Sequence, residues 1–355
     1  MKKFVIYILL LTLSFGTIIG LINYVIDPFN IFETKFLPFQ YQRNERFIKI
    51  KYLDTHHTHF NSYLIGSSRI GTTNPKVLET YIANSKFYNM TLSSATLSDE
   101  LRHIRYMISA GYRIKNLYLQ IDLNNNMTSY LYPTSDYLRK PHPHITGESL
   151  SLYYLDYLLN PFPTNTKGKI VKNLEGKNDD NYDLLLGNWN RPEKDKKISQ
   201  NCSNFIKSEP TFNMPVNPKV KNTYTKINML ALKNIIELSK KNNINLILFT
   251  TPHNHNYLDI IYEKEYYIFL KELLNITDYW DFSGYNSITT NDCNYYDSSH
   301  YTPQIGNLIA AKIFNDKNIF VPSDFGVFIT HKNFESHINQ LKMDRKRWKL
   351  KRNEK

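Results

Sequence analysis

The pattern of hydrophobic and polar positions separates one long apolar run at the start of the chain from many shorter segments after it. Residues 4–22 form a run of 19 residues without a charge. This is long enough to cross the hydrocarbon core of a bilayer as one helix. A cleaved signal peptide would have a shorter apolar region that ends in a small-x-small cleavage site, and no such site follows here. We therefore expect residues 4–26 to be an uncleaved signal anchor that contacts the lipid bilayer.

The charges around this run predict its orientation. Lys2 and Lys3 precede it, and basic residues next to a spanning helix tend to stay on the cytoplasmic side. No second apolar run of comparable length follows. We expect a single-pass protein of the cytoplasmic (inner) membrane whose C-terminal domain faces the periplasm or the exterior.

The rest of the chain alternates between strand and helix patterns. Short apolar runs predict strands, and apolar residues at helical spacing predict helices. The predicted strands are 62–65, 86–92, 116–123, 245–251 and 279–282. The predicted helices are 75–83, 98–110, 225–241, 260–274 and 304–314. This alternation indicates an α/β fold with a parallel sheet.

The same pattern suggests a domain organisation. We expect an anchor at 1–26, a linker at 27–60, an α/β domain at 61–330 and a basic tail at 331–355. Clean periodicity fails at 124–222, apart from a possible helix at 150–159. A structureless loop of that length is improbable inside a compact domain, so this region is either an insertion over the carboxyl edge of the sheet or a decorative excursion.

Composition changes this picture little. The net charge is +12, and the last 15 residues carry eight Lys or Arg against Asp344 and Glu354, so half of the excess lies in the tail. That tail is a solvated helix end or disordered segment, or it contacts anionic lipid or an acidic glycan. No nucleic-acid partner is expected for a domain outside the cytoplasm. Cys202 and Cys293 could pair in an oxidising compartment or remain two buried thiols.

Candidate chemistry lies at the end of the first predicted strand and near the last helix. The strand ends in Gly66, followed by Ser67, Ser68 and Arg69, and ligands in parallel α/β sheets bind beyond the carboxyl ends of strands. Asp297-x-x-His300 precedes the last helix. A serine hydroxyl becomes nucleophilic when an imidazole takes its proton and a carboxylate orients that imidazole.

With these motifs in this order, the chain resembles the SGNH (GDSL-type) hydrolase superfamily. It is similar to the membrane-anchored bacterial branch that contains polysaccharide O-acetyltransferase domains of the alginate-acetylation type. The resemblance covers roughly residues 63–314 and implies a three-layer, flavodoxin-like sheet. Gly66-Ser67-Ser68 matches the family's Gly-Asp-Ser, which implies Ser68 as nucleophile. Asp297 and His300 match its closing motif, which implies His300 as base and Asp297 as the residue that orients it.

The resemblance also implies groups that bind the substrate or the oxyanion. Ser93 or Ser94 stands near the position of the family's second-block Gly. Asp122 stands where the third block has Asn, with Asn124 close behind it. Arg69 either pairs with Asp122 or holds a substrate anion.

His253 and His255 follow the fourth strand and suggest substrate contact or loop polarity, not a metal site. No cofactor is expected.

Two functions remain open at this stage. One is a serine esterase or O-acyltransferase that acts on an O-acylated envelope or extracellular glycan, or on its acyl donor. The other is a non-catalytic envelope protein that binds glycan or organises a membrane-bound acyltransferase. Asp122 and the missing second-block Gly favour the second function, whereas the complete set of Ser68, Asp297 and His300 favours the first.

Overall fold

The computed structural model describes residues 1–133, 135–161, 163–176, 181–214 and 218–353. They form two compact units. The first combines Met1–Thr55 with Tyr132–Asp179, and the second combines His56–Leu131 with Asp180–Lys355. The region that we expected to be one insertion, 124–222, is therefore divided between the units, because its residues 132–179 pack with the N-terminal segment.

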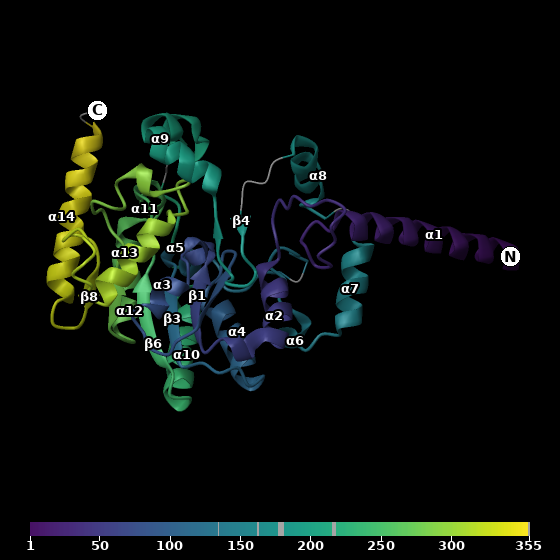
Figure 1. Ribbon diagram of the computed structural model, residues 1–355, viewed down its shortest axis with the longest axis horizontal. Coiled ribbons are helices and arrows are strands. Elements are labelled where there is room, and N and C mark those ends of the chain that lie inside the picture. The colour runs from purple at the N-terminus through teal and green to yellow at the C-terminus, as the bar shows by residue number, and fades with distance from the viewer. Residues whose placement is uncertain (134, 162, 177–180, 215–217, 354–355) are drawn as a thin grey trace. The chain divides into compact units, whose positions relative to one another are not determined.

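A six-stranded sheet forms the centre of the second unit (Figure 1). Its strand order is β2-β1-β3-β6-β7-β8; all neighbouring strands are parallel except β7 and β8, which are antiparallel. The strands are β1 (Ser62–Ser67), β2 (Phe87–Leu92), β3 (Asn116–Ile121), β6 (Asn245–Thr250), β7 (Tyr279–Asp281) and β8 (Val327–Ile329). The five predicted strands and the mixed α/β class are confirmed, whereas β8 was missed because three residues are too few for a periodic signal.

Helices pack against both faces of this sheet. One face carries Leu64, Tyr118 and Phe249, which pack with apolar residues of two helices that flank the sheet. These helices are α3 (Lys76–Glu79) and α13 (Pro303–Ile313). On the other face, the Tyr279 hydroxyl donates to the carbonyl oxygen of Leu270. That face is covered by α4 (Leu97–Ser109), α10 (Thr225–Lys241) and α12 (Glu263–Leu274), which pack side by side.

The parallel register brings several strand ends to one edge. Ser67 pairs with Leu92 at the end of β1 and β2, and Ile121 pairs with Thr250 at the end of β3 and β6. The segments that follow these residues therefore meet at the carboxyl edge of the sheet, where ligands of such sheets bind. The short helices α5 (Leu123–Thr128) and α11 (His255–Asp259) begin there.

The end of the chain is a helix that packs against the second unit, not a disordered tail. Helix α14 spans Phe334–Asn353, and its buried side chains recur at helical spacing, at Phe334, Ile338, Leu341 and Arg345. Near its end, Arg352 Nη1 lies 2.6 Å from Asp259 Oδ2. The many charged residues of the tail mask this apolar stripe in the sequence.

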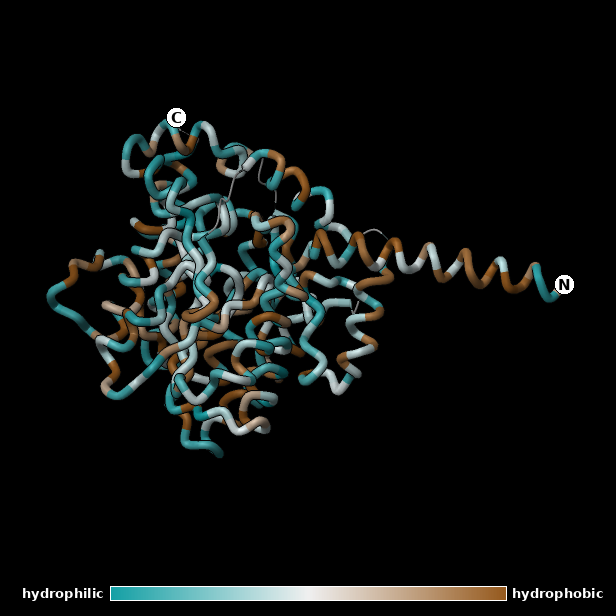
Figure 2. Tube along the Cα trace, turned by 45° about the vertical axis from the view of Figure 1, so that its right-hand side comes forward, coloured by the Kyte–Doolittle hydropathy of each residue, from teal (hydrophilic) through white to brown (hydrophobic). Residues whose placement is uncertain are grey.

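The first unit begins with α1 (Lys2–Ile26), and Figure 2 shows the hydrophobic character of most of its length. Among the described residues it is the one helix long and apolar enough to cross a membrane. The predicted linker contains α2 (Glu45–His56), whose side chains Phe47, Ile50 and Leu53 are buried. Buried Asn44 precedes this helix, and its Oδ1 accepts from the amide of Phe47 at 3.0 Å. The unit also contains α6 (Pro143–Thr146), α7 (Leu150–Leu159), as predicted, and α8 (Thr166–Glu175).

A disulfide joins two distant segments of the second unit. Cys202 lies in α9 (Pro192–Ser208) and bonds to Cys293, 91 residues later in the chain. The sequence left open whether these cysteines pair or remain two thiols, and in the structure they are paired. Cys293 stands four residues before Asp297. The disulfide therefore holds α9 beside the loop that carries Asp297 and His300.

We predict that replacing both cysteines, with Cys202→Ser and Cys293→Ser, lowers the free energy of unfolding by about 3–4 kcal/mol, because a loop of this length restricts the unfolded chain. Urea unfolding of the full chain in detergent would measure it. Ser199→Ala, on the same helix, is the control. An unchanged midpoint in the double variant would contradict the prediction.

Candidate functional site

Ser68 stands where β1 ends and a short helical turn, η2 (Ser68–Thr72), begins. The strand can turn there because Gly66 lies against β3: an added Cβ would meet the Cβ of Gln120 at 2.7 Å. Ser67 caps the turn, since its Oγ accepts from the amide of Arg69. Ser67 points into the protein and is fully buried, whereas Ser68 is half-buried. Of the two serines, Ser68 is the one that faces the edge of the sheet.

His300 and Asp297 complete a hydrogen-bonded chain with Ser68. The Ser68 Oγ lies 3.0 Å from His300 Nε2, and His300 Nδ1 lies 3.0 Å from both carboxylate oxygens of Asp297. When the Nδ1 proton faces the carboxylate, Nε2 presents its lone pair to the serine hydroxyl. The three residues expected to act together are therefore in contact, and their arrangement can activate a serine nucleophile.

Several donors keep Asp297 ionised. Its Oδ1 accepts from the backbone amides of Ser299 and His300, both at 2.8 Å, and Arg191 Nη1 donates to Oδ2 at 2.8 Å. Burial acts to raise the pKa of Asp297, but the His300 ring, Arg191 and these hydrogen bonds outweigh it and hold the pKa well below its usual range. The carboxylate that orients His300 is thus charged at any physiological pH.

Sequence reasoning missed Arg191 and its neighbour Trp189. Both lie at a two-stranded hairpin of β4 (Asn181–Tyr182) and β5 (Trp189–Asn190). The Trp189 indole lies edge-on to His300, with ring centroids 5.5 Å apart, and Arg191 packs over the indole. An added Cβ on Gly71 would meet the indole nitrogen at 2.0 Å, so a glycine there is what lets Trp189 pack against η2. The one available signal was a tryptophan, of which the chain has only three, next to an arginine in a polar stretch.

Hydrogen bonds also hold the loop that carries Asp297 and His300 against its surroundings. The Thr72 hydroxyl of η2 donates to the carbonyl oxygen of Tyr301 at 3.1 Å. On the other side, the Tyr296 hydroxyl donates to Asp195 of α9 at 2.7 Å, and the amide of Ser298 donates to the Thr211 hydroxyl at 3.1 Å. Asp297 and His300 are therefore positioned from both the sheet and the α9 region.

A buried ion pair lies beneath Ser68. The side chain of Arg69 pairs with Asp122, which also accepts from the Ser67 hydroxyl at 2.8 Å and from the amide of Asn125 at 3.0 Å. Burial acts to raise the pKa of Asp122, but Arg69, His253 and these hydrogen bonds outweigh it, so the pKa is lowered. The ion-pair alternative for Arg69 is therefore confirmed. Asp122 is fully buried and its charge is matched, so it does not face a reacting oxygen as a bare carboxylate.

The predicted oxyanion residues differ in how they fit. Because Ser67 pairs with Leu92 at the ends of β1 and β2, Ser94 lies after a strand that ends at the same edge of the sheet as the strand before Ser68. Ser94 has a φ of 55°, a left-handed conformation that glycine adopts most readily, so it has the backbone geometry typical of a glycine position. Asn124 Nδ2 donates instead to the Tyr257 hydroxyl at 3.2 Å, so its amide is engaged elsewhere.

His253 does not have the surface that substrate contact would need. Its ring is fully buried and stacks on Tyr257, with centroids 5.3 Å apart. Burial and nearby Arg69 lower the pKa of His253 to about 3, against the opposing effect of Asp122. The expectation of substrate contact is therefore not met, because the ring packs as a neutral group under the site. His255 pairs with Asp292 at 3.0 Å.

Among the described residues, one cluster in the first unit has the composition of a metal site. Asp54, His142 and His144 of the first unit have ligand atoms within 4.8 Å of one another. However, His144 Nδ1 pairs with Asp54 at 2.6 Å, and His142 Nδ1 accepts from the His144 amide at 3.2 Å. Hydrogen bonding within the unit thus accounts for the cluster.

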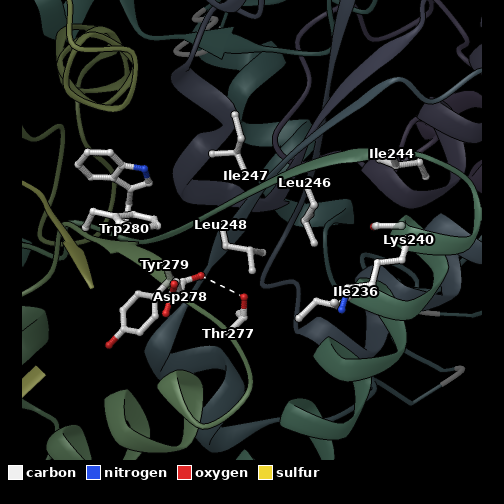
Figure 3. Close-up of a pocket in the computed structure, with 12 residues that line it drawn as sticks. Ile236, Lys240, Ile244, Leu246, Ile247, Leu248, Thr277, Asp278, Tyr279 and Trp280 are labelled. Atoms are coloured by element: carbon white, nitrogen blue, oxygen red, sulfur yellow. Dashed lines mark hydrogen bonds between the residues drawn. The ribbon is translucent and has the colours of Figure 1, made fainter. Parts of the chain in front are cut away.

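A hollow of about 370 Å³ lies where β6 and β7 diverge (Figure 3). Its lining includes Ile244 and Leu246 at the start of β6, Trp280 of β7 and Phe328 of β8. This is the amino half of β6, whereas Ser68 follows the carboxyl end of β1. The hollow therefore belongs to a different edge of the sheet from the Ser68 site.

Comparisons with known proteins add no assignment. No model of a known protein family matches the chain, and no curated protein matches it. The chemistry of the site must therefore be argued from its own geometry.

We predict that Asp122→Ala destabilises the fold by about 3–5 kcal/mol, because it leaves the Arg69 guanidinium buried without its carboxylate. Denaturant unfolding would measure the loss. The exposed Asp278→Ala is the matched control and should change stability by less than about 0.5 kcal/mol. Combining Asp122→Ala with Arg69→Met should recover part of the loss. No recovery would mean that the cost comes from the vacated space and not from the charge.

The lowered pKa of His253 predicts that the folded protein loses stability as the pH falls. Its folded pKa of about 3 lies below the unfolded value of about 6.5, so the unfolded state takes up the proton first as pH falls. The contribution of His253 to stability is complete above pH ~6.5 and is lost progressively down to pH ~3. We expect His253→Phe, which keeps an aromatic ring against Tyr257, to flatten the fall in unfolding free energy between pH 7 and pH 4.5. Parallel slopes for the variant and the wild type would refute this.

Proposed function

We propose that this protein is a membrane-anchored serine esterase or O-acyltransferase that acts outside the cytoplasmic membrane on an acyl ester. The observation that carries the proposal is the hydrogen-bonded chain from Ser68 Oγ through His300 to Asp297, with 3.0 Å at each step. A nucleophile, a base and an orienting carboxylate in this order are the parts that acyl transfer through a covalent intermediate requires. Arg191 adds a further constraint on Asp297.

The proposed reaction proceeds in two halves. As Ser68 Oγ attacks the ester carbonyl, His300 Nε2 takes the hydroxyl proton. The tetrahedral intermediate then collapses, the C–O bond to the leaving alcohol breaks, and His300 returns the proton to that alcohol. Water or an acceptor hydroxyl next attacks acyl-Ser68, again with His300 as base, and releases an acid or a new ester. Asp297 stays ionised and stabilises the imidazolium in both halves.

The oxyanion of each intermediate needs donors near Ser68. We assign this role to the backbone N–H of Ser68 and to backbone N–H groups of the turn after β2, where Ser94 has the backbone conformation of a glycine position. Because Asp122 is neutralised by Arg69 and buried, it poses no electrostatic obstacle to such an oxyanion. Fixed dipoles aimed at developing charge are commonly the largest contribution to catalysis.

The fold supports the same family assignment as the motifs. The five parallel strands, taken in chain order, have the spatial order 2-1-3-4-5, which is the flavodoxin-like order with its ligand site at the carboxyl edge. Together with Gly66-Ser67-Ser68 and Asp297-x-x-His300, this order supports an SGNH-type domain. An O-acylated envelope or extracellular glycan, or its acyl donor, is the substrate class that the resemblance favours.

Two features support an outward-facing domain. The Cys202–Cys293 disulfide is a bond that forms and persists in oxidising compartments. Lys2 and Lys3 at the start of α1 favour a cytoplasmic N-terminus. Both support a position of the α/β unit in the periplasm or outside the cell.

One observation favours the second candidate, a non-catalytic envelope protein that binds glycan or organises a membrane-bound acyltransferase. The Asn124 amide, the nearest candidate for the family's third-block donor, is bonded to Tyr257. A site with fewer oxyanion donors would bind an ester more readily than it turns it over. The following experiment separates the two.

We predict that Ser68→Ala and His300→Ala each reduce turnover of p-nitrophenyl acetate by about three orders of magnitude or more, and that the double variant is no worse than either. Asp297→Asn should retain more activity, since it disturbs only the support of the base. A fluorophosphonate probe should label the wild type and not Ser68→Ala.

Ser299→Ala, in the same loop as His300, is the matched control and should retain activity. If Ser67→Ala abolishes activity and Ser68→Ala does not, the nucleophile is Ser67. A folded wild type with neither turnover nor labelling would instead favour the binding function.

A further inference from the structure

We infer that helix α7 is an interfacial membrane helix, whose leucine face lies in the outer headgroup and acyl boundary of the bilayer that α1 crosses. The inference concerns the first unit alone. It depends on anchoring by α1 and not on the chemistry proposed for Ser68.

The end of α7 is fixed against the last turns of α1. An added Cβ on Gly16 would lie 3.6 Å from the side chain of Leu159, and one on Gly20 would lie 3.9 Å from Leu158. Small residues at such positions let two helices approach closely. Asn23, which is buried, donates to the carbonyl oxygens of Leu158 at 2.7 Å and Asn160 at 2.6 Å. Figure 1 shows α7 running across the direction of α1 rather than along it.

The level of this contact is that of a membrane interface. Gly16 lies six residues before the end of the apolar run at Ile22, which is about 9 Å along a helix axis. Interfacial helices lie with their apolar face about 5–10 Å below the headgroup boundary. If α1 crosses the bilayer, α7 therefore lies in the membrane plane at that depth.

The two faces of α7 differ in the way that this position requires. Leu152, Leu155 and Leu159 recur at i, i+3 and i+7 and are 61%, 52% and 45% exposed, so they form one apolar stripe. Of the two α7 leucines that lie against glycines of α1, Leu159 meets Gly16, the one nearer the start of α1, so its stripe faces toward the bilayer core.

The opposite face of α7 belongs to the protein. Tyr153 and Tyr157 are buried, and the Tyr157 hydroxyl donates to Asp27, just beyond the end of α1, at 3.0 Å. Asp156, at the edge of the leucine stripe, is held by the Tyr137 hydroxyl and by Lys140 at 3.2 Å. The Tyr157 hydroxyl is thus bonded on the side away from the leucine stripe, and the Asp156 carboxylate is paired at the edge of the stripe.

The continuity of this stripe with α1 identifies lipid as its partner. The side chains of α1 are exposed along most of its length, and none of its most apolar window is buried, so lipid surrounds the helix that α7 touches when α1 crosses the bilayer. Three exposed leucines bordering that surface leave apolar area in water, and burial of apolar area is favourable. The bilayer covers the surface of α1 and the leucine stripe of α7 together. The first unit is thereby held flat on the membrane.

The test uses the full chain reconstituted in phosphatidylcholine vesicles, with an environment-sensitive NBD fluorophore on single introduced cysteines. Leu152→Cys and Leu155→Cys report on the stripe. Leu230→Cys, on α10 of the second unit and 58% exposed, is the matched control. The native cysteines are joined in a disulfide and do not react. Retained near-UV circular dichroism shows that each variant is folded.

We expect aqueous iodide to quench the two stripe positions at least about threefold less than position 230, as for side chains below the headgroups. Lipids with spin labels near the headgroup should quench these two positions and not the control. Equal iodide quenching at all three positions would overturn the inference, because the stripe would then lie in water. Protection from both iodide and the spin-labelled lipid would also overturn it, because another protein surface, such as a second copy of the chain, would then cover the stripe.

Discussion

The buried pair of Arg69 and Asp122 is the interaction on which the geometry around Ser68 depends. Asp122 lies just after β3 and Arg69 just after β1, so their contact ties two neighbouring strand ends together. The same carboxylate accepts from Ser67 and from the amide of Asn125, which fixes the turn before Ser68 and the start of α5. A buried charge is tolerated only when it is paired and hydrogen-bonded, and here each requirement also positions a segment of the site.

The second unit supplies the remaining parts of the site from outside its sheet. The β4–β5 hairpin brings Trp189 and Arg191 to His300 and Asp297, and the disulfide holds α9 beside the same loop. Asp297 therefore receives donors from its own turn and from a segment more than a hundred residues earlier in the chain. The orientation of His300 is therefore a property of the packed unit, and not of the Asp-x-x-His turn alone.

The first unit has exposed apolar side chains around a buried centre that contains polar groups. The exposed apolar side chains of this unit include those of α1, the stripe of α7 and Leu174 of α8, whereas its buried centre contains polar groups such as Asn44 and Asp27 that accept or donate several hydrogen bonds. Asp27 holds α7 to the end of α1 through the Tyr157 hydroxyl, and Asn44, which precedes α2, donates to the Tyr153 hydroxyl of α7 at 3.3 Å. This unit thus combines an apolar helix long enough to cross a membrane with a polar, hydrogen-bonded centre.

Local pattern determined much of the fold and part of the site. The apolar run of α1, the alternation of strands and helices, and the motifs around Ser68, Asp297 and His300 depend on residues close together in sequence, and the structure contains each of them. Only tertiary structure decided the pairing of Arg69 with Asp122, the burial of His253, the arrival of Arg191, and the packing of α2 and α14. Those outcomes arise from contacts between segments distant in sequence, for which periodicity and residue type carry no signal. The free energy of burying a charge or a ring depends on what the fold brings beside it.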